Sequence, residues 1–350
     1  PLKSVKRNLP TIIDVARLSG VSKSTVGRAL SGAKNISPAT LEAVLNAAKT
    51  LGYERYHLAQ SLRSGRTGML GLVIPDIANP FWAEVARGAQ DKAAQSGASL
   101  LIFSSDWNLE REASHLRALR QVRVDGAIVN PVENRIDDLA RFGMPVVLIG
   151  SSAEQHPELP SVGSDIAQGV ELGLNHLKSL GHHRPIFLLG QFERLAHVKF
   201  QRAIHDYFVA QGEDPDTLVI EQGDYTAESG NAAMQRILVS SSPRPICLFA
   251  ANDLMALGAL LAVRDAGLSC PEDVSILGFD GIPTGLFSDP GLSTIAKPAR
   301  GIGDRAMTLL QAQLSGETSH DRIVLPCHLV PRGTLQDLSG SETSKLTARG

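Results

Sequence analysis

The sequence predicts an all-α head at the N-terminus and an α/β body that contains two parallel sheets. Three short amphipathic helix patterns follow one another within residues 1–68. From residue 69 onward, apolar strand patterns alternate with helix patterns, the order that builds parallel sheets. Because 350 residues are more than one core usually serves, we expect the body to form two sheets.

The charge of the chain is divided at the same point as the fold. Residues 1–68 carry eleven Lys and Arg against three Asp and Glu, a net charge of +8. The remaining residues carry 23 basic against 33 acidic side chains, a net charge of −10. This division favours a polyanion as the partner of the head alone, although a solvated basic face without a partner would carry the same charge.

Composition argues against several classes of protein. The three cysteines are far apart, so they predict neither a disulfide framework nor a zinc site, and they suit a reducing cytoplasm. The N-terminus has no apolar signal region, and no apolar run approaches the roughly 18 residues that a membrane span needs. We therefore expect a cytoplasmic protein that is neither secreted nor inserted in a membrane.

Two of the head's helices surround a glycine turn. Thr11 is placed to cap a first helix that Gly20 ends, and Ser22 is placed to cap a second helix that runs to Leu30. Ser37 and the proline after it predict the start of a third helix. In the second helix Val26, Ala29 and Leu30 form an apolar stripe, which leaves these residues facing outward: Lys23, Ser24, Thr25, Gly27 and Arg28.

This arrangement is typical of a helix-turn-helix. The exposed helix must enter a DNA major groove about 12 Å wide, with side chains near its N-terminus reaching the base edges. Lys23 and Ser24 occupy that place, and Arg28, about one turn later, can bond a guanine with two hydrogen bonds. A small helical bundle that binds another protein is the alternative.

The head resembles the headpiece of the lac repressor/purine repressor family. The pattern Thr-Ile-x-Asp-Val-Ala-x-x-x-Gly-Val-Ser-x-x-Thr-Val-x-Arg-x-Leu runs from Thr11 to Leu30, and Leu51-Gly52-Tyr53 follows. One departure is Gly27, where the family usually has serine. The resemblance implies a helix-turn-helix domain over residues 1–56 with these DNA-contacting residues: Thr11, Ser22, Lys23, Ser24, Thr25 and Arg28.

Residues 57–68 look like the hinge helix of the same family. The segment is short and basic, too small to form a stable helix alone. The resemblance implies that Leu62 is an apolar wedge in the DNA minor groove, with Ala59 and Arg63 beside it. The alternative is a flexible linker, which we expect in the absence of DNA.

In the body, the expected strands are 69–75, 100–104, 126–130, 146–149, 185–189, 218–221, 246–250 and 274–279. The expected helices are 79–96, 108–121, 136–142, 166–180, 192–210, 226–240 and 253–266. Parallel sheets bind ligands beyond the carboxyl ends of their strands, so the loops there are the candidate site. No phosphate-binding glycine loop, nucleophile elbow or metal-binding pair of histidines follows a strand, which disfavours an enzyme.

The body resembles the periplasmic-binding-protein-like core of the same family, from Asn79-Pro80-Phe81 to Gly278-Phe279-Asp280. The resemblance implies an effector-binding core over residues 69–337. Its N-subdomain would span about 69–162 and 294–326, and its C-subdomain about 163–292 and 328–337. Crossings are expected near 161–165, 291–294 and 325–330. Residues 338–350 lack a leucine heptad and look disordered, so a dimer is expected rather than a tetramer.

Matched residue by residue, Phe81 and Tyr225 would be aromatic walls of a ligand cleft. Asn130, Asn252 and Asp280 would bond ligand hydroxyls or amines. Asn252 and Asp280 also suit loop caps, and Phe81 also suits the core.

The sequence departs from the family at three positions of this cleft. Phe200 stands where the family has arginine, Gly150 where aspartate is frequent, and Lys297 where glutamine is usual. We expect Lys297 to hold an anion, with Phe200 as an apolar wall.

The resemblance implies a DNA-binding transcriptional regulator, expected to repress as a homodimer on a pseudo-palindromic operator. A sugar or sugar acid in the cleft would control it. No cofactor, metal, membrane or catalytic activity is expected. A protein co-regulator in place of the small ligand is the alternative, and a solute-binding protein is a distant one.

Overall fold

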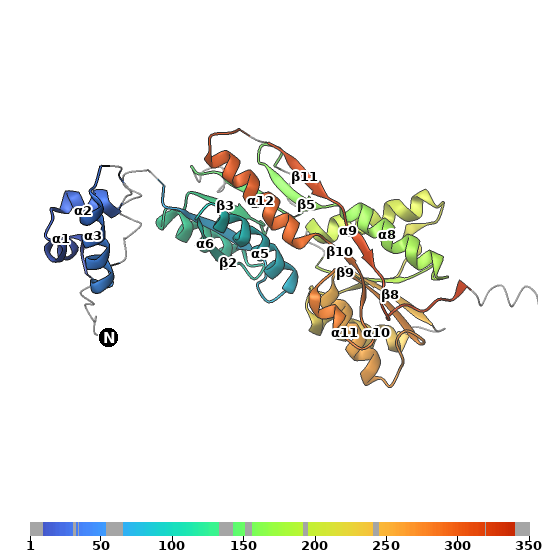
Figure 1. Cartoon of the computed structure of the whole chain (residues 1–350). Coiled ribbons are helices and arrows are strands. Elements are labelled where there is room, and N and C mark those ends of the chain that lie inside the picture. The colour runs from blue at the N-terminus through green and yellow to red at the C-terminus, as the bar shows by residue number, and fades with distance from the viewer. Residues whose placement is uncertain are drawn as a thin grey trace, which may run out of the picture. The chain divides into compact units, whose positions relative to one another are not determined.

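A computed structural model describes residues 10–30, 33, 35–53, 66–132, 143–150, 156–191, 195–240, 245–318 and 320–339 (Figure 1). The chain divides into two compact units, Pro1–Thr67 and Gly68–Gly350. The expected helix 136–142 and the hinge residues Ala59, Leu62 and Arg63 lie outside the described residues, as does nearly all of the tail.

The first unit contains the three expected helices, α1 (Ile12–Ser19), α2 (Lys23–Leu30) and α3 (Pro38–Leu51). The side chain of Asp14 accepts hydrogen bonds from the backbone N–H of Thr11 at 2.8 Å and from its hydroxyl at 2.7 Å. Ser22 and Ser37 each accept the N–H three residues later at 3.2 Å, so the predicted caps begin α2 and α3.

The core of this unit is small and formed by all three helices. Val15, Val26 and Val44 have no exposed surface, and alanines of α2 and α3 complete the cluster. Leu45 of α3 does not belong to this core, since half of its surface is exposed. The inner face of α3 passes instead through Val44, Ala47 and Ala48, because small side chains let α3 lie close to α1 and α2.

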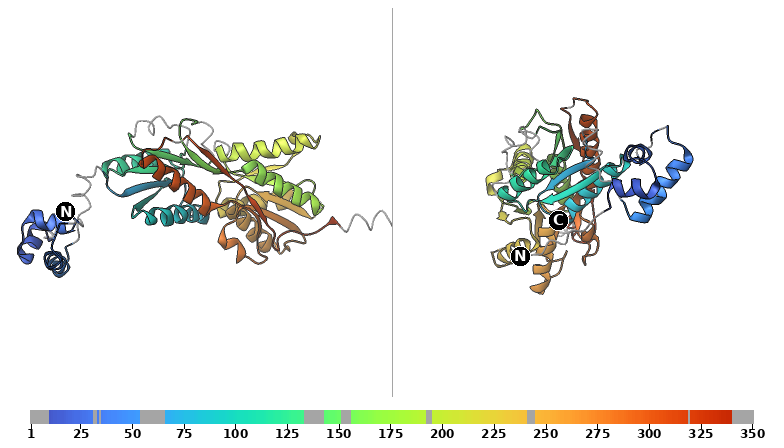
Figure 2. Two further views of the ribbon diagram at one scale, coloured as in Figure 1. Left: turned by 45° about the horizontal axis from the view of Figure 1, so that its top comes forward. Right: turned by 90° about the vertical axis from the view of Figure 1, so that its left-hand side faces the viewer.

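The second unit contains two six-stranded sheets, each with helices on its faces (Figures 1 and 2). We call each sheet with its helices a lobe. The first sheet has the order β2-β1-β3-β4-β5-β11 and is parallel throughout. Its strands are β1 (Met69–Ile74), β2 (Ser99–Ser104), β3 (Gly126–Val129), β4 (Val146–Ile149), β5 (Ser161–Ser164) and β11 (Arg322–Leu325).

The second sheet has the order β7-β6-β8-β9-β10-β12. Its neighbours are parallel except β10 and β12, which pair antiparallel. Its strands are β6 (Ile186–Leu189), β7 (Ile220–Gln222), β8 (Ile246–Ala250), β9 (Val274–Asp280), β10 (Ser293–Ala296) and β12 (His328–Val330).

The helices of the first lobe are α5 (Pro80–Gln95), α6 (Leu109–Gln121) and α12 (Ala299–Leu314). Those of the second lobe are α8 (Ile166–Ser179), α9 (Leu195–Ala210), α10 (Ala227–Ser240) and α11 (Asp253–Asp265). Two short 3-10 helices, Pro215–Thr217 and Pro283–Leu286, lie in loops of the second lobe. No helix among the described residues is both long and apolar enough to cross a membrane.

The chain passes between the lobes three times, after β5, after β10 and after β11. The second passage lies at Lys297–Pro298, later than the expected 291–294. The reason is that Ser293–Ala296 pairs with β9 and therefore still belongs to the second sheet. Similarly, β5 keeps Gly163 and Ser164 in the first sheet, beyond the boundary expected at 162.

Candidate functional site

The exposed face of α2 carries the side chains that the sequence singles out. Lys23, Ser24 and Arg28 are exposed, while Thr25 is half-buried. The hydroxyl of Ser22 lies 2.8 Å from the hydroxyls of both Ser24 and Thr25. The N-terminus of α2 therefore presents a cluster of hydroxyls next to a lysine, with an arginine one turn along the helix.

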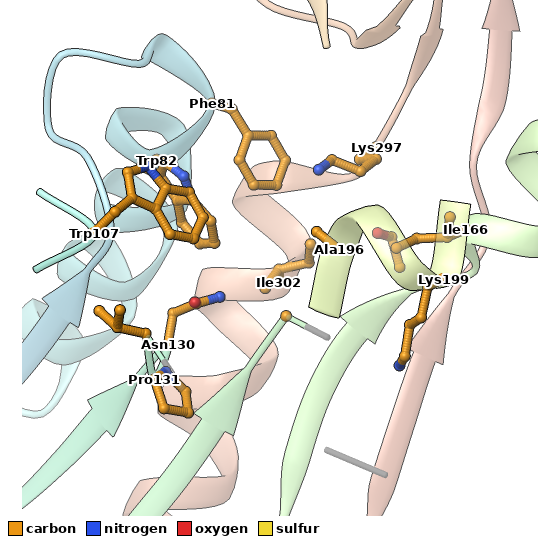
Figure 3. A pocket seen from close by; sticks show the side chains of 13 residues that line it. Phe81, Trp82, Trp107, Asn130, Pro131, Ile166, Ala196, Lys199, Lys297 and Ile302 are labelled. Carbon is orange, nitrogen blue, oxygen red and sulfur yellow. The ribbon is translucent and has the colours of Figure 1, made fainter. Parts of the chain in front are cut away.

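A cavity that is open to solvent lies between the two lobes (Figure 3). Both lobes and the passages between them contribute to its wall. Its lining residues are Phe81, Trp82, Trp107, Asn130, Pro131, Val132, Gly150, Ser164, Ile166, Ala196, Lys199, Lys297 and Ile302. The cavity lies beyond the carboxyl ends of the parallel strands, where the sequence places the candidate loops.

Aromatic side chains form one wall of this cavity. Phe81 and Trp82, in the first turn of α5, meet edge to face with ring centroids 5.0 Å apart. Trp107, in the loop after β2, stacks on Tyr225 of the second lobe with centroids 6.0 Å apart and planes inclined by 20°. Tyr225 is not among the lining residues, so it supports the wall through Trp107. Sequence reasoning missed both tryptophans.

Lys297 and Asp280 form a buried ion pair at the cavity edge. The Lys297 Nζ lies 2.6 Å from the Asp280 carboxylate and 3.8 Å from the centroid of the Phe81 ring. The Asn79 side chain adds a hydrogen bond to Asp280. Burial raises the pKa of Asp280, and the ammonium group of Lys297 opposes that rise. Lys297 lines the cavity, whereas Asp280 does not.

A second buried carboxyl, that of Asp253, lies behind this pair. It accepts the hydroxyl of Thr294 at 2.6 Å and the backbone N–H of Ile282 at 2.7 Å. Burial, and then the charge of Asp280, raises the pKa of Asp253 to about 7. Asp253 therefore fixes the loop after β9 to β10, a role that the sequence pattern alone did not indicate.

The two predicted asparagines have different surroundings. Asn130 is buried at the cavity wall, and its Nδ2 donates to the carbonyl of Ile149 at 3.0 Å. Asn252 caps α11: its Oδ1 accepts the N–H of Met255 at 2.9 Å, and its Nδ2 donates to the carbonyl of Tyr225 at 2.8 Å. The structure does not bring Asn252 to the cavity wall.

Gly150 has a positive φ of 86°, and a Cβ atom there would overlap the Nδ2 of Asn130. The Asn130 amide therefore occupies the space that a side chain at position 150 would need.

Phe200 lies in the core of the second lobe and is not among the lining residues. Its ring meets Phe249 and Phe279 edge to face, with centroids 5.5 and 5.0 Å apart. Ala196 and Lys199 of the same helix reach the cavity instead. Their three-residue spacing on one face of α9 was the available signal for Lys199, which sequence reasoning missed.

Comparison with known proteins agrees with this architecture. Residues 11–55 match the family described as bacterial regulatory proteins, lacI family, and residues 174–335 match a periplasmic binding protein-like domain. Catabolite control protein A of Priestia megaterium is 34% identical over 324 residues, covering 91% of this chain and 97% of that protein. The chain belongs to the lacI family.

Other relatives of this lacI-family regulator include the transcriptional repressor CytR of Escherichia coli K12. It is 32% identical over 334 residues, covering 94% of this chain and 97% of CytR. Among solved structures, the lac repressor dimer bound to operator and the anti-inducer ONPF matches with a TM-score of 0.83 at 26% identity, covering 93% of this chain and 99% of that one.

A second solved structure is an Enterococcus faecium lacI-family regulator with bound ribose. It matches with a TM-score of 0.67 at 26% identity, covering 77% of this chain and 99% of that one.

Proposed function

We propose that this lacI-family regulator represses transcription by binding a pseudo-palindromic operator as a homodimer. We also propose that a small metabolite, bound in the cavity between the lobes, controls its affinity for DNA. The observation that carries the proposal is the exposed face of α2, where hydroxyls, Lys23 and Arg28 project from a head of net charge +8. The family's repressors and the operator-bound lac repressor dimer support it.

Within the head, we assign two kinds of DNA contact. Lys23, Ser24 and Arg28 face outward along α2 and would reach base edges in the major groove. The hydroxyls of Thr11, Ser22 and Thr25 lie at helix N-termini, where backbone N–H groups also favour phosphate oxygens. Leu62, with Ala59 and Arg63, would widen the minor groove at the operator centre.

Within the cavity, we assign the direct contacts to Phe81, Asn130 and Lys297, which line it. Tyr225 would act through Trp107, which stacks on it, and Asp280 would act through its ion pair with Lys297. Asn252 would act through its hydrogen bond to the Tyr225 backbone. Regulators with bound ribose and with cellobiose are among the similar structures, which supports a sugar or a sugar acid as the effector. We propose binding without catalysis, and a cytoplasmic location, where chromosomal DNA lies.

The test selects DNA from a random pool with the full chain and then titrates the selected site in the presence of neutral sugars and sugar acids. We expect a two-fold-related sequence to be enriched and one ligand to change its affinity. That ligand should stabilise the protein by about 2.7 kcal/mol at 100 times its Kd. Failure to enrich any sequence would refute operator binding, and control only by an added protein would favour the co-regulator alternative.

A further inference from the structure

The Lys297 ammonium occupies a small subsite built by both lobes. Lys297 follows β10 at the passage into α12, and its side chain is only 17% exposed. Figure 3 shows its nitrogen directed toward the ring of Phe81. The carboxylate of Asp280 lies 2.6 Å away on one side and the Phe81 ring 3.8 Å away on the other.

These surroundings are the chemistry that recognises an ammonium group. A carboxylate supplies a charge-assisted hydrogen bond, and the face of an aromatic ring attracts a cation within about 6 Å of its centroid. The Asp280 side chain is 6% exposed and also bonded by Asn79, so the carboxylate is held in place.

The two halves of the subsite come from different lobes. Phe81 lies in the first turn of α5 in the first lobe, whereas Asp280 ends β9 in the second. An ammonium group bound to both therefore contacts both sides of the cleft. In addition, Lys297 lines the cavity, so the subsite is in contact with the space that a diffusible molecule would enter.

We propose that Asp280, Phe81 and Asn79 form a binding subsite for a primary ammonium group, and that Lys297 is its tethered ligand. By occupying the subsite, Lys297 links the lobes before any diffusible molecule binds. A consequence is that an effector of the natural protein meets an N–H donor at this wall rather than the carboxylate of Asp280. A carboxylate oxygen, which accepts a charge-assisted hydrogen bond, is therefore favoured there over a hydroxyl, which can bind the ammonium group only through its lone pairs.

The test removes the tether and supplies the amine separately. Lys297→Ala deletes three carbons and the ammonium group, which n-propylammonium ion restores. The sequence contains two tryptophans, Trp82 and Trp107, and both line the cavity, so intrinsic fluorescence reports on its occupancy. Fluorescence and melting temperature are measured against n-propylammonium chloride, with n-propanol and sodium chloride at equal concentrations as controls for size and ionic strength.

We expect Lys297→Ala to melt lower than the natural protein by roughly 5 °C or more, because Asp280 is left buried without its cation. n-Propylammonium should restore part of the loss and change the fluorescence in a saturable manner, and n-propanol should not. The natural protein should show no such response, nor should Lys199→Ala, the matched change of the other lysine at the wall. Adding Asp280→Asn to Lys297→Ala should abolish the response.

An unchanged melting temperature in Lys297→Ala, or an n-propylammonium response no greater than that to sodium chloride, would overturn the proposal. Should Lys297→Ala not fold, Lys297→Met and Lys297→Arg decide instead. The proposal requires the uncharged Met variant to melt well below the Arg variant, and equal melting temperatures would contradict it. None of these measurements involves DNA, so their failure would leave operator binding and effector control unaffected.

Discussion

Asp253 shows how one buried carboxyl makes stability depend on pH. Its pKa is raised from the ordinary 3.8 to about 7, so between these values the folded protein binds a proton that the unfolded chain does not. The free energy of unfolding contributed by this group is therefore greatest at low pH and falls as pH rises toward 7. Above 7 the deprotonated carboxyl remains as a cost.

We predict that Asp253→Asn reduces this dependence. Urea unfolding at pH 5 and pH 8 should show that the natural protein loses more stability between the two than the variant does, by up to about 2.7 kcal/mol. The subtraction between variants cancels the contributions of histidines. An identical loss in both proteins would mean that Asp253 does not titrate in this range.

Substitution of Arg28 tests whether side chains of α2 contact the edges of DNA bases. Arg28→Ala should cost about 1–3 kcal/mol at one base position and relax the preference there. Arg264→Ala, which removes an exposed arginine of α11, should leave DNA affinity unchanged. Affinities for the selected site and its single-base variants give the answer. A loss that is uniform across all sequences would place Arg28 on a phosphate.

How far sequence predicts the cavity differs from residue to residue. Phe81, Asn130 and Lys297 belong to loops or helix starts at strand ends, and the structure places all three at the wall. Phe200 does not reach it, because its match to the family's arginine gives its position in the chain but not which face of α9 turns toward the cavity. The ion pair of Lys297 with Asp280 also could not be predicted from the sequence. The two residues are 17 positions apart, and only the pairing of β9 and β10 brings them together.

At the scale of elements, α5 and α12 pack against each other through a glycine. A Cβ atom at Gly303 would overlap the carbonyl oxygen of Val85. Gly301 lies on the same helix, but its Cβ would make only ordinary contacts, the nearest at 3.6 Å. The two positions therefore form a matched pair for testing the approach of the helices.

We predict that Gly303→Ala destabilises the protein by roughly 1–3 kcal/mol or more, because the helices must separate. Gly301→Ala should be neutral or stabilise it by about 0.5–1 kcal/mol, since alanine favours a helix more than glycine does. Denaturant midpoints of the two variants provide the comparison. Equal effects of the two substitutions would rule out close packing at position 303.

The hinge is an element that we expect to matter only on DNA. Leu62→Ala should reduce both operator bending and specific affinity while leaving the melting temperature of the free protein unchanged, because the wedge acts between base pairs. Bending is measured by gel phasing of the complex. Unchanged bending would remove Leu62 from that role.

Elements differ in how readily sequence reveals them. Strands β1, β3, β4, β6, β8 and β9 are apolar runs between turn signals and are found where expected. Helix α12 was not predicted, because its first turns contain Gly301 and Gly303, which weaken a helix pattern. The packing role of Gly303 can be recognised only in the structure, where the absence of a side chain lets α5 lie close to α12.

At the scale of the whole molecule, the positive charge lies on the head and the negative charge on the remainder of the chain. The head carries +8 and the remainder −10, which concentrates attraction for a polyanion on the unit that contains α1, α2 and α3. The division into a helical head and a two-sheet body could be predicted because it follows from hydrophobic period and charge along the chain. The position of the passages could be predicted only to within a few residues, because strand pairing, not sequence pattern, decides where each sheet ends.

Affinity for the selected operator, measured with the full chain at a series of salt concentrations, tests the central claim most directly. Because contacts to phosphates release counterions, log K should fall linearly with log salt, by about 0.9 for each phosphate neutralised. With 6–10 such contacts, the affinity should fall by roughly 10³–10⁵ between 50 and 200 mM salt. An affinity that stays flat over that range would show that the basic head has another purpose and would contradict the account.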